Sequence, residues 1–250
     1  MIPYVVSEKI KIKHTFLNKL IWLAPFVPIL FAFLVSGDYV QLNSYNWWYT
    51  MILPGMLSLS CVLLVEKDKK MNNRAILSLP VSLKRVWLSK ILLVLGILIC
   101  SCIIFFCGIQ LFGLLININD FLAIPVADAL LGIIVLVVTF MWQIPICLFL
   151  GNKIGVFLTV LLNMGVNVFL GIQFATKSSW WMNPYAYPSR LMIPIVKILP
   201  NGLLAKPESV TFKPELLSYH VLLPGIVISV VLFLLFTYVT TKWFEKQEAK

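Results

Sequence analysis

Charged residues are scarce in this sequence of 250 residues. Lys, Arg, Asp and Glu together make up 12% of it, whereas hydrophobic residues make up 60%. A soluble domain usually carries about 25% charged residues, because water must hydrate its surface. The composition therefore excludes an ordinary soluble globule and indicates a chain surrounded by lipid.

The sequence also lacks the motifs of several enzyme classes. It has no GxxxxGK[ST] loop to hold nucleotide phosphates, and no HExxH or other closely spaced set of metal ligands. Its two histidines, His14 and His220, have no catalytic partner near them in the sequence, and Asp120 and Asp128 fit solvated loop charges. We therefore expect no enzymatic activity and no cofactor bound by this chain.

Two further absences concern the hydrophobic blocks. No ionisable residue falls clearly in the middle of a block, which disfavours a proton- or ion-coupled carrier. The five cysteines lie within the blocks, without a spacing that would gather thiolates around a metal, and are expected to pack as small apolar residues.

Residues 1–19 are polar and basic without a signal-peptide cleavage site, so the first block is expected to stay in the mature protein.

Six hydrophobic blocks are present, and each is long enough to approach a full crossing of a bilayer. About 20 residues, rising 1.5 Å each, span the hydrocarbon core as a helix. The runs are continuous and lack the alternation of a β-barrel strand. We predict an all-α integral membrane protein with a single transmembrane domain over residues 1–250. The predicted spans are residues 20–36, 47–65, 91–115, 128–150, 155–172 and 219–241.

Most cations fall on one side of this predicted bundle. Four precede the first span, seven lie between the second and third, one lies between the fourth and fifth, and three follow the sixth. The short opposite loops, Gly37–Asn46 and Ile116–Val126, have no Lys or Arg. The positive-inside rule therefore predicts a multi-pass membrane protein with both termini in the cytoplasm. Topology and anionic membrane lipid explain the net charge of +10, so no nucleic-acid partner is expected.

The cytoplasmic stretch Glu66–Lys90 is too polar to cross the membrane. Its middle, Met71–Leu79, is predicted to form a short helix, because Asn72 or Asn73 is suited to capping its start and Pro80 ends it. Such a helix would lie along the inner membrane face with an apolar side available to another protein. An ordinary basic interfacial loop is the alternative.

The end of this stretch reads SLPVSLKRVWLSK, and it resembles the type-2 permease subunits of ABC exporters. In that family the residues before the Leu-Pro pair form a coupling helix that docks on a separate ATPase subunit. MNNRAIL stands here where the family often has Gly-Thr-Leu-Glu. The matching residues are Leu79, Pro80, Val81, Ser82, Lys84 and Lys90. The resemblance assigns ATPase coupling to Lys70, Met71, Asn72, Asn73, Arg74, Ala75, Ile76, Leu77, Ser78 and Leu79.

The small size, Glu66 at the end of the second span and the late segment NPYAYPSRLMIPI resemble the lantibiotic-immunity permeases, in particular their MutE/EpiE-like branch. This resemblance implies a membrane subunit that expels a lantibiotic or related antimicrobial peptide from the membrane. It also implies two copies of an ABC ATPase that binds ATP and Mg²⁺. A second six-span permease, either a sister subunit or a second copy, would complete the pore around an amphipathic cationic peptide.

The segment Gln173–Ser218 is long for a loop in a compact membrane protein, which suggests a functional element. Its stretch Leu191–Leu204 is apolar but interrupted by prolines, so it is predicted to lie in the outer leaflet as an interfacial or re-entrant helix. The four aromatic residues before it are a candidate receiving surface for cationic cargo through stacking and cation–π contacts, or a simple membrane anchor. These residues are Trp180, Trp181, Tyr185 and Tyr187.

Three amides are the most noticeable polar groups inside the spans. Gln143 lies in the fourth span, and Asn163 and Asn167 share one face of the fifth because they are four residues apart. Such amides either form hydrogen bonds between helices or line a substrate path.

Three classes of function remain open at this point. The first is the membrane subunit of an ABC exporter, either for a lantibiotic or for another amphipathic cargo such as a lipid or another antibiotic. The second is a membrane scaffold or sensor that transports nothing. The third, an intramembrane enzyme, would need catalytic His, Glu or Asp groups inside the spans, and the sequence lacks them.

Overall fold

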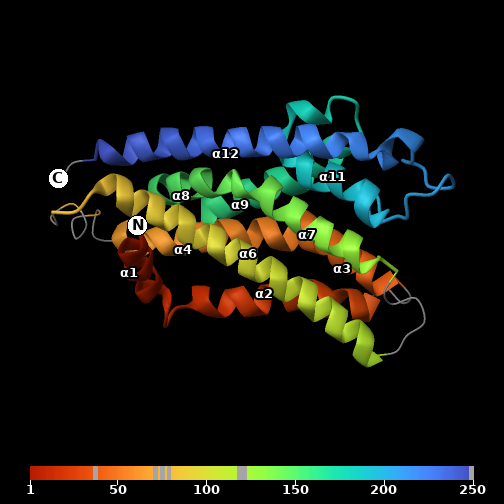
Figure 1. The fold of residues 1–250 in the computed structure, drawn as a ribbon, viewed down its shortest axis with the longest axis horizontal. Coiled ribbons are helices and arrows are strands. Elements are labelled where there is room, and N and C mark those ends of the chain that lie inside the picture. The colour runs from red at the N-terminus through yellow and green to blue at the C-terminus, as the bar shows by residue number, and fades with distance from the viewer. Residues whose placement is uncertain (36–38, 70–72, 74–76, 78–79, 117–122, 248–250) are drawn as a thin grey trace.

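A computed structural model describes residues 1–35, 39–69, 73, 77, 80–116 and 123–247 of the chain. Over these residues it is a bundle of long helices with no named strand (Figure 1). The all-α fold class predicted from the sequence is confirmed. The α-helices are α1 (Ile2–Ile12), α2 (Phe16–Val35), α3 (Val40–Trp47), α4 (Leu53–Lys69), α6 (Leu83–Ile116), α7 (Val126–Met141), α8 (Gln143–Ile154), α9 (Val156–Val166), α10 (Ile172–Ala175), α11 (Tyr187–Val196) and α12 (Leu222–Glu245).

Several of these helices join into longer membrane-spanning units. A π-helical turn, Trp48–Ile52, links α3 to α4, so that Val40–Lys69 runs as one helix of 30 residues. A second π-helical turn, Asn167–Gly171, joins α9 to α10. Five helices are long and apolar enough to cross a membrane, and α7 with α8 makes a sixth span if this bent pair counts as one.

The bend between α7 and α8 measures 42° and has a local cause. Pro145 lies in the first turn of α8 and has no N–H to donate to the preceding turn. The fourth predicted span, residues 128–150, is therefore a broken helix rather than a straight one. The helix that contains the third predicted span, residues 91–115, starts at Leu83, where Ser82 accepts hydrogen bonds from the N–H groups of Arg85 and Val86.

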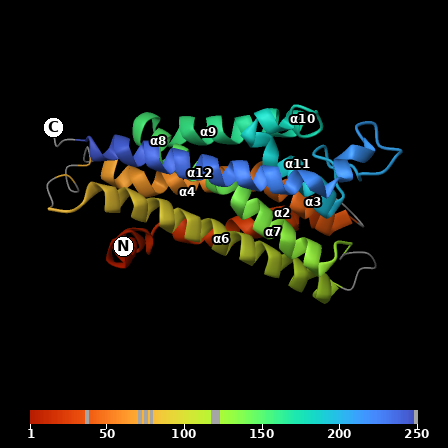
Figure 2. The same cartoon turned by 45° about the horizontal axis from the view of Figure 1, so that its top comes forward.

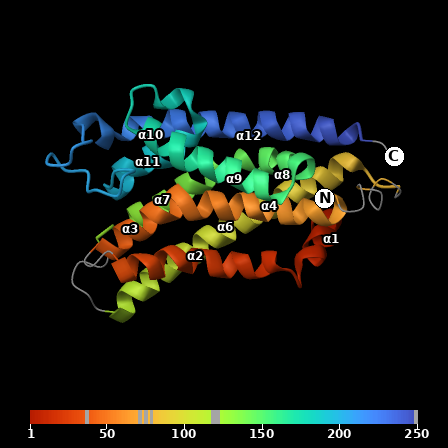
Figure 3. The ribbon, with the colours of Figure 1, turned by 180° about the vertical axis from the view of Figure 1, so that it is seen from behind.

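The long helix α4 occupies the middle of the bundle. It packs on α8, α9 and α2, while α12 covers α7, α6 and α8 from the other side (Figures 2 and 3). Large aromatic side chains fill the centre: the Trp48 ring stacks on Phe105, with centroids 5.0 Å apart, and the Tyr45 ring meets the same Phe105 edge-on. The outward faces of α2, α9 and α12 carry exposed apolar side chains, as expected of surfaces that face lipid.

Both chain termini lie at the same end of the bundle (Figure 1). That end also holds α1, the roots of the segment between α4 and α6, and the tight turn between α8 and α9. These are the parts of the chain that carry most of its cations. The segment between α10 and α12 lies toward the opposite end, where the hairpin after α11 projects beyond the helices.

Candidate coupling and transport sites

Most of the predicted ATPase-coupling segment lies outside the described residues. This applies to Lys70, Met71, Asn72, Arg74, Ala75, Ile76, Ser78 and Leu79. Asn73 and Leu77 are described, and Asn73 adopts a left-handed backbone with φ of 58°, which asparagine tolerates better than most residues. The Asn73 N–H donates to the Asp68 carbonyl at 2.8 Å, and its side-chain amide donates to the Gln247 side chain at 3.2 Å. Asn73 is therefore hydrogen-bonded both to the end of α4 and to a residue that follows α12.

A cluster of four charges lies directly at the roots of this segment; we call Glu8, Lys11, Asp68 and Lys90 the root cluster. The Lys90 ammonium is 1% exposed and donates to Asp68 at 2.6 Å and to Glu8 at 2.7 Å. Lys11 also donates to both carboxylates, at 2.7 Å to Glu8 and 3.2 Å to Asp68. Asp68 lies in the last turn of α4, and Lys90 lies early in α6. The root cluster therefore joins the two helices that flank the segment to each other and to α1.

The balance of charge explains how these groups tolerate burial. A single buried ion carries a large desolvation cost, but two ammonium groups against two carboxylates satisfy one another. At Lys11, burial lowers the pKa, while the hydrogen bond and charge of Glu8 and the charge of Asp68 raise it, and the net effect is a pKa above the ordinary value. Lys11 is therefore held in its protonated form by the two carboxylates that it shares with Lys90.

The helix α1 was not foreseen from the sequence, which indicated only a polar, basic leader. In the structure it buries the Glu8 carboxylate and leaves the apolar side chains of Ile2, Val6 and Ile10 exposed. The four-residue spacing of these three apolar side chains is the signal that would have identified an interfacial helix. The short run of charges around it concealed that spacing.

Further contacts brace the same end of the bundle. The Trp87 indole of α6 donates to the Thr240 hydroxyl of α12 at 3.0 Å and stacks on Phe244. The Lys69 ammonium donates to the carbonyls of Gly151 and Lys153, in the last turn of α8. The helices on either side of the coupling segment, α4 and α6, are thus bonded at this end to α8 and α12, respectively.

The three amides within the spans form a closed hydrogen-bonded group. The Gln143 side chain accepts from Asn163 at 3.1 Å and from Asn167 at 3.2 Å, and it donates to Asn167 at 3.3 Å. Asn163 also donates to the carbonyl of Pro54 on α4 at 3.2 Å. All three side chains are buried, and their main polar groups are paired with one another. This geometry favours helix association through hydrogen bonds over a path for cargo.

The four outer aromatic residues do not form one continuous surface. Tyr187 is buried at the start of α11, where its hydroxyl donates to the carbonyl of Trp181, and Tyr185 packs edge-on against Trp142 inside the bundle. Trp180 is partly buried between Tyr187 and the Arg190 guanidinium. Trp181 is 57% exposed. Of the candidate receiving residues, Trp181 is therefore the most exposed, Trp180 and Tyr185 are partly buried, and Tyr187 is buried.

The predicted outer helix is shorter than the apolar stretch Leu191–Leu204 and begins before it. All ten residues of α11 are buried, and α11 packs against α7 and α12, as a re-entrant helix shielded by the bundle would. Lys197 ends it in the left-handed conformation, and an antiparallel bridge then pairs Ile198 with Leu204. The expectation of a helix through Leu204 is wrong, because Pro200 and the turn at Gly202 send the chain back as a hairpin.

Two glycines on neighbouring spans make room for this inserted segment. A Cβ atom at Gly171 would lie 2.8 Å from the Tyr185 carbonyl oxygen, and one at Gly225 would lie 2.8 Å from the Leu191 side chain. The close approach at Gly171 is to backbone, which cannot move aside as a side chain can. The glycine at this position is therefore required by packing.

Comparison with known proteins agrees with this architecture. The family model described as "ABC-2 family transporter protein" matches residues 6–245. Comparisons with curated proteins and with solved structures give no match.

Proposed function

Because the chain belongs to the ABC-2 transporter family, we propose that it is the membrane subunit of an ATP-driven exporter whose ATP and Mg²⁺ sites lie on a separate ATPase. The match over residues 6–245 includes every long helix of the bundle. Members of this family are membrane components of ABC transporters, so an ATPase partner is implied in general terms. The proposal adds where that partner acts and what is moved.

The observation that carries the coupling proposal is the root cluster. A docked ATPase transmits force only if the segment that it contacts is fixed to the helices that must move. The Asp68 carboxylate and the Lys90 ammonium, which flank the segment, are 2.6 Å apart. Glu8 and Lys11 of α1 are bonded to the same two groups. A displacement of residues 70–79 would therefore move α1, α4 and α6 together.

The coupling proposal is tested by replacing the two apolar residues at the centre of the segment. Ile76→Asp with Leu77→Asp should release the ATPase from the purified permease, because burying each such side chain in a groove of the partner contributes about 1.5–3 kcal/mol. Leu203→Asp with Val210→Asp is the matched control, since both residues are exposed in the hairpin at the other end. If the first pair leaves the ATPase bound while the protein stays folded, the segment does not dock.

The complete exporter is proposed to contain two ATPase copies and a second six-span permease, either a sister subunit or a second copy of this chain. The membership of the ABC-2 family supports this, because up to six spans in this chain are half of the usual twelve-span pore of such exporters. Chemical cross-linking in native membranes distinguishes the two arrangements. A second copy of this chain gives a cross-linked product of twice its mass, whereas a sister subunit gives a product that contains two different chains.

The proposed cargo is an amphipathic cationic peptide of the lantibiotic class, cleared from the membrane for immunity. The similarity of NPYAYPSRLMIPI to the lantibiotic-immunity permeases supports it, and so do the accessible rings of Trp180 and Trp181 beside that motif. Replacing both tryptophans with leucine keeps their apolar anchoring and removes the π faces that attract cations. Tolerance to a lantibiotic in cells carrying the whole complex should then fall at unchanged protein level.

A Tyr187→Phe variant serves as a control in the same motif, since it removes only a buried hydroxyl. Unchanged tolerance in the double leucine variant would rule out these rings as the receiving surface. ATP hydrolysis that responds to a lipid or to another antibiotic, and not to the peptide, would assign a different amphipathic cargo.

A further inference from the structure

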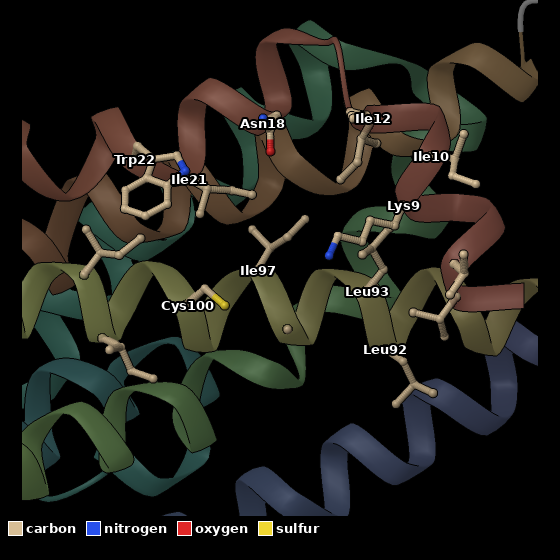
Figure 4. Close-up of a pocket in the computed structure, with 16 residues that line it drawn as sticks. Lys9, Ile10, Ile12, Asn18, Ile21, Trp22, Leu92, Leu93, Ile97 and Cys100 are labelled. Carbon is tan, nitrogen blue, oxygen red and sulfur yellow. The ribbon is translucent and has the colours of Figure 1, made fainter. Parts of the chain in front are cut away.

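A groove opens between α1, α2 and α6 near the end of the bundle where both termini lie (Figure 4). Its volume is about 790 Å³. Apolar side chains from α2 and from the residues between Leu92 and Ile104 of α6 form its walls, with Trp22 among them. The charged groups that line it are Lys9 of α1 and Lys13, which directly follows α1, and no carboxylate lies among its described lining residues.

The groove has the depth of a single membrane leaflet. From Leu92 to Ile104, α6 rises about 18 Å at 1.5 Å for each residue. The hydrocarbon core of a bilayer is about 30 Å thick, so each leaflet contributes about half of that. The apolar wall therefore follows α6 from its basic end to about the middle of the membrane, which matches the length of an acyl chain.

The two lysines at the groove differ from the two lysines of the root cluster. Lys11 and Lys90 are saturated with carboxylate partners, whereas the ammonium groups of Lys9 and Lys13 make no hydrogen bond or ion pair with the residues that the structure describes. The Lys9 ammonium points into the groove above Leu93 and Ile97 (Figure 4). Glu8 and Lys11 bond the opposite side of α1 to α4 and α6. The fold therefore sets the backbone positions of Lys9 and Lys13 beside the groove.

We infer that this groove binds one anionic phospholipid of the leaflet in which α1 lies. An acyl chain lies along the apolar wall of α6, and the phosphate is held between Lys9 and Lys13. The charge complementarity favours this occupant, since basic pockets at the cytoplasmic ends of membrane helices attract anionic headgroups. A cationic peptide would be repelled by the two lysines, so the groove is separate from the proposed cargo site and does not depend on that proposal.

The test measures lipid that remains bound to the full chain. Protein is reconstituted in phosphatidylcholine vesicles that contain phosphatidylglycerol, extracted in a mild detergent, and analysed by native mass spectrometry for retained lipid. The charge variant is Lys9→Gln with Lys13→Gln. Its matched control is Lys19→Gln, which removes an exposed lysine outside the groove.

The wild-type protein should retain phosphatidylglycerol in preference to phosphatidylcholine. Each lysine near an anionic headgroup contributes about five-fold in binding, so the double variant should lose most of this preference. Lys19→Gln should keep it. Equal retention of the two lipids by the wild type, an unchanged preference in the double variant, or the same loss in Lys19→Gln would each overturn the assignment.

A second variant tests the apolar part of the groove with both charges in place. A Cβ atom at Gly96 would meet nothing within 4 Å, so a larger side chain can grow into the groove without disturbing the core. Gly96→Leu should lower the total amount of retained lipid at an unchanged melting temperature. If Gly96→Leu instead separates a dimer in detergent and leaves the retained lipid unchanged, a second copy of the chain covers the groove and the inference is wrong.

Discussion

The Lys90 ammonium lies 2.6 Å from the Asp68 carboxylate, across a separation of 22 residues that contains the whole predicted coupling segment. Both groups are buried, and Glu8 of α1 contacts the same ammonium. This pair sets the distance between the end of α4 and the start of α6. In the proposed exporter, this pair would link the segment that contacts the ATPase to the bundle.

The first prediction concerns the loss of this ammonium group. Lys90→Met should lower the free energy of unfolding by about 3–5 kcal/mol, because it leaves buried carboxylates with too little positive charge. Adding Glu8→Gln to this variant should recover part of the loss. The measurement is thermal unfolding in detergent.

The control for that measurement is the exposed pair formed by Lys242 and Glu245, which are 2.9 Å apart. Lys242→Met should change stability little, since water already solvates both groups. A melting temperature for Lys90→Met equal to that of the wild type would show that the root cluster contributes nothing to the fold.

The second prediction is a loss of α1 docking at alkaline pH. The pKa of Lys11 is raised above its ordinary value of 10.5, so the stabilising effect of this residue is complete below pH 10.5 and disappears as the pH rises through the raised pKa. Proteolysis between α1 and α2 should therefore increase at high pH. In Lys11→Arg this increase should occur at a higher pH than in the wild type, because a guanidinium stays protonated there. The two profiles would coincide if Lys11 did not hold α1.

Hydropathy and the distribution of cations were sufficient to predict the helical class and the general positions of the six hydrophobic segments. They succeeded because a helix in lipid must be apolar over about 20 residues regardless of its neighbours. The membrane boundaries of the spans and the cytoplasmic side of the termini stay predictions. The structure adds that both termini lie at one end, together with most of the cations.

The parts that were missed depend on contacts between distant residues. Nothing in the sequence relates the four residues of the root cluster to one another, because they lie in three separate segments: Glu8 and Lys11, Asp68, and Lys90. Only the fold brings them within hydrogen-bonding distance. The length of α11 was missed for a similar reason. Its apolar pattern continues past Val196, but the hairpin that follows is stabilised by tertiary packing that no local pattern reveals.

The third prediction concerns the packing of the re-entrant helix. Gly171→Ala places a methyl group 2.8 Å from the Tyr185 carbonyl oxygen and should destabilise the protein by about 1–3 kcal/mol through overpacking. Gly165→Ala, in the same span, meets nothing within 4 Å and should be neutral or stabilising, because alanine favours a helix. Thermal unfolding of the two variants measures the difference. Equal melting temperatures would mean that the segment at Tyr185 moves away freely.

The fourth prediction fixes the orientation in the membrane. In a background without the five native cysteines, Val210→Cys should react with an impermeant thiol reagent in intact cells, because Val210 is 96% exposed in the hairpin at the proposed outer end. Lys153→Cys, at an exposed position in the last turn of α8, should react only after the cells are permeabilised. Labelling of Lys153→Cys in intact cells, with Val210→Cys protected, would reverse the topology.

The central claim is that this chain receives the energy of ATP hydrolysis through residues 70–79, and cross-linking from inside that segment tests it most directly. Leu77→Cys, treated in native membranes with a short thiol-to-amine reagent, should form a covalent product with the ABC ATPase. Val210→Cys, at the opposite end of the bundle, should form none. A product from Val210→Cys, or none from Leu77→Cys in a complex that still co-purifies with the ATPase, would contradict the account.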